Sequence, residues 1–262
     1  MTATRDNGTM KLDPSRIANR EKLILTGIYL SKFGSLGLKR LGFRTYAEAY
    51  NVVGYALGSR PSSIKNYRDE FDPIFPNSRK GWHKREIRAY CKRVLDEYEG
   101  LDLDSFSGLI KSFAGYNENA WSATVDAQQE ESSSAFAKRL ITGLAAERYF
   151  ESVHATIPEF QGCAMENTTQ LGCGYDFRML KKQDDTFLAV EVKGLREKTG
   201  SIALTPREHS AATKLQDRFF LFVVKDFQKI PYHEIFPNPL TGRLRFTKTE
   251  QVSIQISWLT RI

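Results

Sequence analysis

Hydrophobic and polar positions alternate along two neighbouring segments of the C-terminal half. The segments are GYDFRM (174–179) and TFLAVEVK (186–193), and a polar stretch separates them. Residues two apart on a strand share a face, so Glu191 and Lys193 lie together on one face. Val190 and Val192 lie on the other, which is apolar. The pattern predicts two strands joined as a hairpin.

Helical and strand-like patterns surround this hairpin. SSSAFAKRLITGLAAERYFESVHA (132–155) is typical of a long amphipathic helix, and SIAL (201–204) of a further short strand. TPREHSAATKLQ (205–216) predicts a helix with Thr205 as its cap in a capping box. RFFLFVVKD (218–226) has the continuous apolar run of a buried strand. We therefore expect an α/β domain with a mixed sheet flanked by helices.

The N-terminal half has helical patterns. TYAEAYNVVGYALG (45–58) predicts a helix capped by Thr45, and SSIKNYRDEF (62–71) a second helix capped by Ser59 or Ser62. Two helices joined by a short turn, with basic residues on the second, are typical of a helix-turn-helix.

A third N-terminal pattern, KREIRAYCKRVLDEYEG (84–100), also has helical spacing. The polar segment 115–134 lacks any periodicity and indicates a linker. We therefore expect a helical DNA-recognition domain over 1–120 and a second domain over 130–262. Residues 227–262 are expected to add a terminal strand or two.

The composition favours a folded protein that is neither membrane-spanning nor secreted. Hydrophobic residues make up 41% of the 262 residues, which is sufficient for an ordinary folded core. No apolar run is long enough to span a bilayer, and the first residues lack a signal-peptide pattern. Three cysteines without metal-like spacing indicate reduced thiols. We expect a cytoplasmic protein with no membrane partner.

The net charge of +7 is concentrated in the N-terminal half. Residues 1–125 hold 20 Lys/Arg against 14 Asp/Glu, whereas residues 126–262 hold 18 against 17. Such a basic excess favours a polyanionic partner.

One stretch, residues 58–85, gathers many of these cations. Arginine and lysine bind phosphates, and Arg or Asn can read purine edges in the major groove. The candidate DNA-binding residues are Arg60, Lys65, Asn66, Arg68, Arg79, Lys80 and Lys84. For each residue alone, a solvated surface charge is the competing interpretation. The same two interpretations apply to Arg207 and Lys214. The chain has no glycine-rich phosphate loop, so we expect no ATP-driven motor.

The hairpin places two carboxylates near each other. If the turn is centred between Gln183 and Asp184, Asp176 lies opposite Glu191, where like charges repel. Lys193 offsets part of this repulsion, and a divalent cation offsets more. Mg²⁺ prefers carboxylate oxygens and keeps several waters. The competing interpretation is a surface hairpin whose carboxylates form salt bridges.

Glu147 is a further candidate on the predicted helix 132–155. It lies seven residues after Leu140 and three after Leu144, so it shares their apolar face. A carboxylate on such a face needs a partner. That partner is either the proposed metal site, directly or through water, or a base such as Arg148.

The pattern G-Y-D, fourteen residues and E-V-K-G resembles the active-site signature of the PD-(D/E)XK nuclease superfamily. LTPREHSAA (204–212) is similar to the L-T-x-x-E element of Mrr-like and NO VEIN C-terminal-type members. The resemblance covers about residues 133–226. It implies that Asp176 and Glu191 ligate Mg²⁺ and that Lys193 assists the attacking water. Glu147 matches a glutamate often found on the preceding helix, whereas Tyr175 stands where the superfamily name has proline.

These observations together indicate a Mg²⁺-dependent, sequence-specific double-stranded DNA endonuclease. A chain of this size without a motor is typical of a type II restriction endonuclease, the nuclease of a restriction-modification system. Cleavage of both strands implies a homodimer and a two-fold symmetric target. The alternatives are a modification-dependent, repair or junction nuclease, a non-catalytic DNA-binding protein, and an RNA-directed nuclease.

Overall fold

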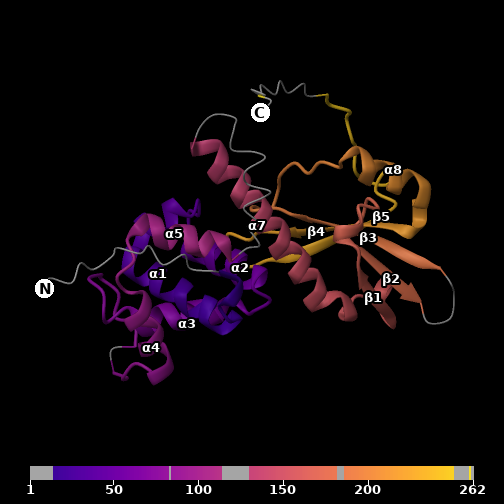
Figure 1. Ribbon diagram of the computed structural model, residues 1–262. Helices are drawn as coiled ribbons and strands as arrows, with labels where there is room; N and C mark the ends of the chain where they lie inside the picture. The colour runs from indigo at the N-terminus through magenta and orange to yellow at the C-terminus, as the bar shows by residue number, and fades with distance from the viewer. Residues whose placement is uncertain (1–13, 83, 114–129, 182–185, 251–259, 261–262) are drawn as a thin grey trace, which may run out of the picture.

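The computed structural model describes residues 14–82, 84–113, 130–181, 186–250 and 260. The described N-terminal residues form the helices α1 (Asn19–Arg40), α2 (Tyr46–Ala56), α3 (Pro61–Phe71), α4 (Ala89–Tyr98) and α5 (Leu103–Ser112). The long helix α7 (Glu130–Val153) lies between these helices and a sheet. Helix α8 (Pro206–Leu215) lies at the sheet, away from the N-terminal helices (Figure 1).

A five-stranded mixed sheet forms the C-terminal part. Its strands are β1 (Cys163–Asn167), β2 (Phe177–Lys181), β3 (Phe187–Gly194), β4 (Phe219–Lys225) and β5 (Tyr232–Pro237), and they pair in sequence order. Only the β3–β4 pair is parallel, and α8 lies in the connection between these two strands. The other pairs are antiparallel. This architecture confirms the predicted fold class.

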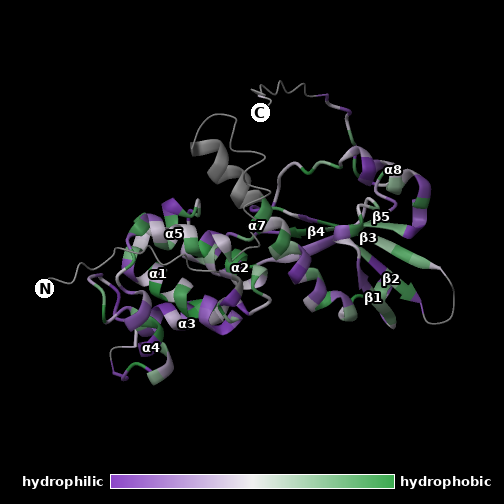
Figure 2. Cartoon of the chain, viewed as in Figure 1, coloured by the Kyte–Doolittle hydropathy of each residue, from purple (hydrophilic) through white to green (hydrophobic). Residues whose placement is uncertain are grey.

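Each face of the sheet packs against a helix. Val190 and Val192 of β3 belong to the large core that includes Ala145 and Phe150 of α7. Ala189, which points to the opposite face, joins a smaller cluster with α8. The strands are largely hydrophobic in Figure 2, whereas α8 carries mostly hydrophilic residues. The alternation predicted for β3 is therefore correct.

The N-terminal helices share the large core with the sheet. The ring of Tyr55 on α2 lies 5.3 Å from that of Tyr149 on α7. The side-chain amide of Asn51 donates to the backbone oxygens of Phe227 at 2.8 Å and Lys229 at 2.9 Å. Helix α2 is therefore joined to both α7 and the connection between β4 and β5.

The predicted helix pair is present as α2 and α3. Thr45 caps α2, because its hydroxyl accepts a hydrogen bond from the Glu48 N–H at 3.1 Å. The predicted serine cap of α3 is wrong, since Arg60 precedes Pro61 at the first helical position without a side-chain cap. Helix α4 begins at Ala89, five residues later than the predicted start at 84. A DNA-reading role for this pair stays a prediction.

Two further expectations concern connections. The segment 201–204 is not a strand, because it lies outside the ladders of the sheet and leads into the N-terminal cap of α8. The predicted linker 115–134 lies mostly outside the described residues, as does the turn at Gln183 and Asp184. Strand β5 supplies a strand expected within 227–262. Among the described residues, no helix is both long and apolar enough to cross a membrane.

Candidate active site

The hairpin brings Asp176 opposite Glu191. Phe177 pairs with Val190 in the β2–β3 ladder, so the preceding residue, Asp176, faces Glu191 as predicted. The Asp176 N–H donates to the Val190 carbonyl at 2.9 Å. The Val192 N–H in turn donates to Oδ2 of the Asp176 carboxylate at 2.8 Å. Backbone pairing therefore fixes the position of this carboxylate.

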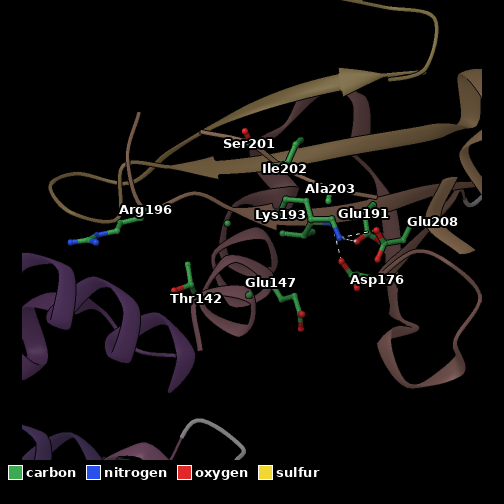
Figure 3. A pocket seen from close by; sticks show the side chains of 13 residues that line it. Thr142, Glu147, Asp176, Glu191, Lys193, Arg196, Ser201, Ile202, Ala203 and Glu208 are labelled. Carbon is green, nitrogen blue, oxygen red and sulfur yellow. Dashed lines mark hydrogen bonds and ion pairs between the residues drawn. The ribbon is translucent and has the colours of Figure 1, made fainter. Parts of the chain in front are cut away.

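Lys193 links two carboxylates from different elements. Its Nζ lies 2.6 Å from Glu191 Oε1 and 2.8 Å from Glu208 Oε2 (Figure 3). Glu208 also accepts a hydrogen bond from the Thr205 N–H at 2.9 Å, which completes the predicted capping box of α8. The Glu208 side chain thus both caps the N-terminus of α8 and pairs with Lys193.

Glu147 on α7 lines the same pocket as Asp176, Glu191 and Lys193. The helix crosses close to β3, since a methyl group on Gly194 would lie 2.9 Å from the Thr142 carbonyl oxygen. Glycine is therefore required at this crossing. Arg148, the alternative partner considered for Glu147, instead pairs with Glu151 at 2.7 Å.

These side chains line a pocket of about 820 Å³. Figure 3 shows Glu147, Asp176, Glu191 and Lys193 around it. The other lining residues are Thr142, Gly143, Val192, Gly194, Arg196, Ser201, Ile202, Ala203 and Glu208. The structure thus brings together all four residues predicted for catalysis, and their roles stay a prediction.

Burial raises the pKa of three carboxyl groups in this pocket. Burial, followed by repulsion from Asp176, raises the pKa of Glu191 to about 9. Burial likewise raises the pKa of Asp176 to about 6, although the Val192 N–H and Lys193 oppose it. Burial, then Asp176 and Glu151, raise the pKa of Glu147 to about 7. The negative charge of the pocket is thus incompletely compensated.

Burial acts on the pKa of Lys193 in the opposite sense. Burial lowers the pKa of its ammonium group, but the carboxylates of Glu191 and Glu208 outweigh burial and raise it. The lysine therefore remains a cation and a hydrogen-bond donor at neutral pH.

The donor set fits a hard divalent cation. Asp176 and Glu191 offer carboxylate oxygens, which Mg²⁺ prefers, and a cation would stabilise the charged forms that burial, and then nearby carboxylates, disfavour. Within the described residues, no group of three or more His, Cys, Asp or Glu side chains is placed to hold a metal ion. Mg²⁺ commonly uses only one or two carboxylates and completes its coordination with water and phosphate oxygens.

The predicted DNA-binding residues fall into two groups. Arg68 and Arg79 turn inward, and Arg79 Nη2 lies 2.7 Å from the buried Asp72 Oδ1. The guanidinium group of Arg68 also lies over the rings of Tyr46 and Tyr50. The remaining candidates are exposed: Arg60, Lys65, Asn66, Lys80 and Lys84.

Arg196 is a lining residue that the sequence did not reveal. Its Nε lies 2.8 Å from Oε1 of Glu48, a side chain on α2 that is almost fully buried. The sequence around Arg196 gives no signal that would distinguish it from an ordinary surface arginine. Its partner is 148 positions away, so only the fold brings the two together.

Part of the chain matches a known protein family. Residues 146–236 match the family described as "Protein NO VEIN, C-terminal", a domain type linked to PD-(D/E)XK-like nucleases. No curated protein and no solved structure matches the chain. The matched range contains all four predicted catalytic residues but less than half of the chain. Residues 146–236 are therefore similar to the NO VEIN C-terminal domain.

Proposed function

We propose that the chain is a Mg²⁺-dependent, sequence-specific endonuclease of double-stranded DNA, of the type II restriction kind. One observation carries this proposal: one buried and two half-buried carboxyl groups meet one lysine in a pocket, and all four residues lie in the range that matches a nuclease-linked domain family. Their raised pKa values fit a site that compensates its charge only when a cation binds.

Asp176 and Glu191 would hold Mg²⁺ in this pocket. When bound there, Mg²⁺ would supply Lewis-acid chemistry to the phosphate and to the attacking water. The Val192 N–H fixes the Asp176 carboxylate, and Lys193 fixes that of Glu191. Both ligands are thus held in position before substrate arrives, which limits the reorganisation that binding requires.

Lys193 and Glu147 would act on the substrate and the attacking water. The Lys193 ammonium group donates hydrogen bonds to this water or to a nonbridging phosphate oxygen, where negative charge develops. Glu147, with a pKa near 7, can accept the proton that the water loses. The water oxygen bonds to phosphorus, a bridging P–O bond breaks, and the departing oxygen takes a proton from solvent.

The N-terminal helices would bind the duplex beside this pocket. The exposed side chains of Arg60, Lys65, Asn66, Lys80 and Lys84 are the candidates for DNA contact. A homodimer would present two active sites to the two strands of a symmetric target.

The test is incubation of purified protein with unmethylated plasmid DNA in Mg²⁺ and, separately, in EDTA. We expect discrete fragments that require Mg²⁺. The Lys193→Ala variant is the control for a contaminating nuclease, since it should give no fragments.

Other outcomes identify the alternatives. Cleavage of methylated DNA alone would indicate a modification-dependent enzyme, and preference for branched DNA a repair or junction nuclease. Cleavage of RNA alone would indicate an RNA-directed nuclease. Salt-sensitive DNA binding without cleavage of any substrate would contradict the catalytic proposal and leave a DNA-binding protein.

A further inference from the structure

A second, smaller pocket lies beside the first turn of α8. It has a volume of about 430 Å³ and lies between this helix and the loop that precedes Asp176. Its lining includes Gly172 and Cys173 from the loop, and Arg207, Ser210 and Lys214 from the helix. None of these residues takes part in the catalytic arrangement described above.

The lining of this pocket is positively charged. Arg207 and Lys214 are seven residues apart, so they lie on the same face of α8, about 10 Å apart along its axis. Ser210 lies between them and offers a hydroxyl donor. The described lining contains no carboxylate, and neither cation forms an ion pair within the described part of the chain.

The loop is shaped to fit Arg207. Gly172 and Gly174 have φ values of +63° and +88°, which favour glycine. A methyl group on Gly174 would lie 2.6 Å from the Arg207 carbonyl oxygen, and one on Gly172 would lie 3.3 Å from Arg207 Nη1. Both glycines therefore let the loop approach the arginine closely.

The two pockets share these structural elements. Glu208 points to the catalytic pocket and binds Lys193, whereas its neighbour Arg207 lines the second pocket. Gly174 similarly lies two residues before Asp176. A DNA strand whose reacting phosphate sits at Lys193 would therefore carry its neighbouring phosphates past α8.

We propose that the second pocket binds backbone phosphates of DNA next to the phosphate that is cleaved. This inference rests on the proposed nuclease function. Arg207 and Lys214 supply the charge, and Ser210 supplies a hydrogen bond. Such contacts hold the strand in register and do not depend on base sequence.

The test measures affinity for a labelled duplex in EDTA, by fluorescence anisotropy, between 50 and 200 mM NaCl. Each phosphate contact contributes about 0.9 to the slope of log K against log salt. We expect the double variant Arg207→Ala/Lys214→Ala to bind more weakly, with a slope shallower by about 2. Both side chains are exposed, and alanine favours helix, so the fold should persist.

Three controls isolate the pocket. Lys181→Ala/Lys229→Ala makes the same charge change at exposed positions outside both pockets and should leave the slope almost unchanged. Arg207→Lys/Lys214→Arg should preserve the slope, because both charges remain. Ser210→Glu should weaken binding more than Thr213→Glu, which adds the same charge on α8 at an exposed residue outside the pocket lining.

The outcomes separate this inference from the proposed function. If wild type cleaves DNA with Mg²⁺ but the two alanine double variants have equal slopes, the inference is wrong and the nuclease function stands. If Ser210→Glu and Thr213→Glu have the same effect, the pocket is likewise not the contact. If wild type neither binds nor cleaves DNA, both proposals fall.

Discussion

Buried carboxylates occur in both halves of the molecule, but their surroundings differ. Among the N-terminal helices, Asp72 is paired with Arg79 and accepts a hydrogen bond from Ser31 at 2.7 Å. Burial alone would raise the pKa of Glu70, but hydrogen bonds from Arg88 outweigh it and lower the pKa. Each of these carboxylates has an arginine partner.

In the pocket of the candidate active site, the effect of burial on the carboxyl pKa values is instead left largely uncompensated. Asp176, Glu191 and Glu147 share a pocket with Lys193, which also binds Glu208. The pKa of all three carboxyls is raised. Burial of a carboxylate therefore does not by itself mark a functional site. We propose that a functional site is instead marked by buried carboxylates that lack enough cationic partners. The variants described next test this difference.

The largest expected effect is on cleavage. Replacing Lys193 or Asp176 by alanine removes a group proposed to act on the reacting phosphate or to hold the cation. We expect the initial cleavage rate on plasmid DNA to fall by about a hundredfold to a thousandfold or more. Circular dichroism should show an unchanged fold. Lys181→Ala, an exposed lysine outside the pocket, should cleave normally, and cleavage by both pocket variants would refute the assignment.

Arg79→Ala should mainly reduce stability. It leaves the buried Asp72 carboxylate without its closest cation, and breaking a buried pair from one side costs about 3 kcal/mol or more. Urea unfolding followed by fluorescence measures the loss. The free energy of unfolding would stay near the wild-type value if Arg79 served only to contact DNA.

Glu191→Gln should have the opposite effect on the metal-free protein. The pKa of Glu191 in the folded state, about 9, exceeds that of an unfolded glutamate, about 4.3. Between these values the folded state binds more protons, so this group makes the free energy of unfolding fall as pH rises.

Thermal unfolding in EDTA from pH 6 to 9 tests this sign. We expect the wild-type Tm to fall with pH, and Glu191→Gln to reduce that fall. At pH 8 the variant should unfold at a higher temperature than the wild type. An equal pH dependence in both proteins would show that the Glu191 carboxyl group does not cause the loss of stability with rising pH.

Lys80→Ala should show the smallest effect, although Lys80 is next in sequence to the half-buried Arg79. Lys80 is exposed, so we expect a change in the free energy of unfolding within about 0.5 kcal/mol. Duplex affinity should weaken, and its salt slope should become shallower by about 1. Anisotropy titrations at several salt concentrations measure both. An unchanged slope would place Lys80 outside the DNA interface.

The sequence predicted the hairpin and the position of its site because both depend on local rules. Strand alternation fixed the face of Glu191 and Lys193, and the pairing register brought Asp176 opposite Glu191. The capping box at Thr205 and Glu208 is equally local. Its additional contact with Lys193 is not, because it depends on how α8 packs against the sheet.

Other elements lack a local signal. Strand β1 lies at the sheet edge with mostly exposed residues, so no apolar alternation marks it. Helix α1 is buried on every side from Leu23 to Ser31, which removes the polar face that reveals a helix. The inward turn of Arg68 and Arg79 likewise depends on Asp72, whose burial the sequence does not show.

The most direct test of the central claim is thermal unfolding at pH 8 with EDTA and with Mg²⁺, for wild type and Glu191→Gln. If Asp176 and Glu191 form a cation site, Mg²⁺ should raise the wild-type Tm. Glu191→Gln should start from a higher Tm in EDTA and respond little to Mg²⁺. The claim of a cation site would be contradicted if Mg²⁺ left the wild-type Tm unchanged, or if it raised the Tm of both proteins equally.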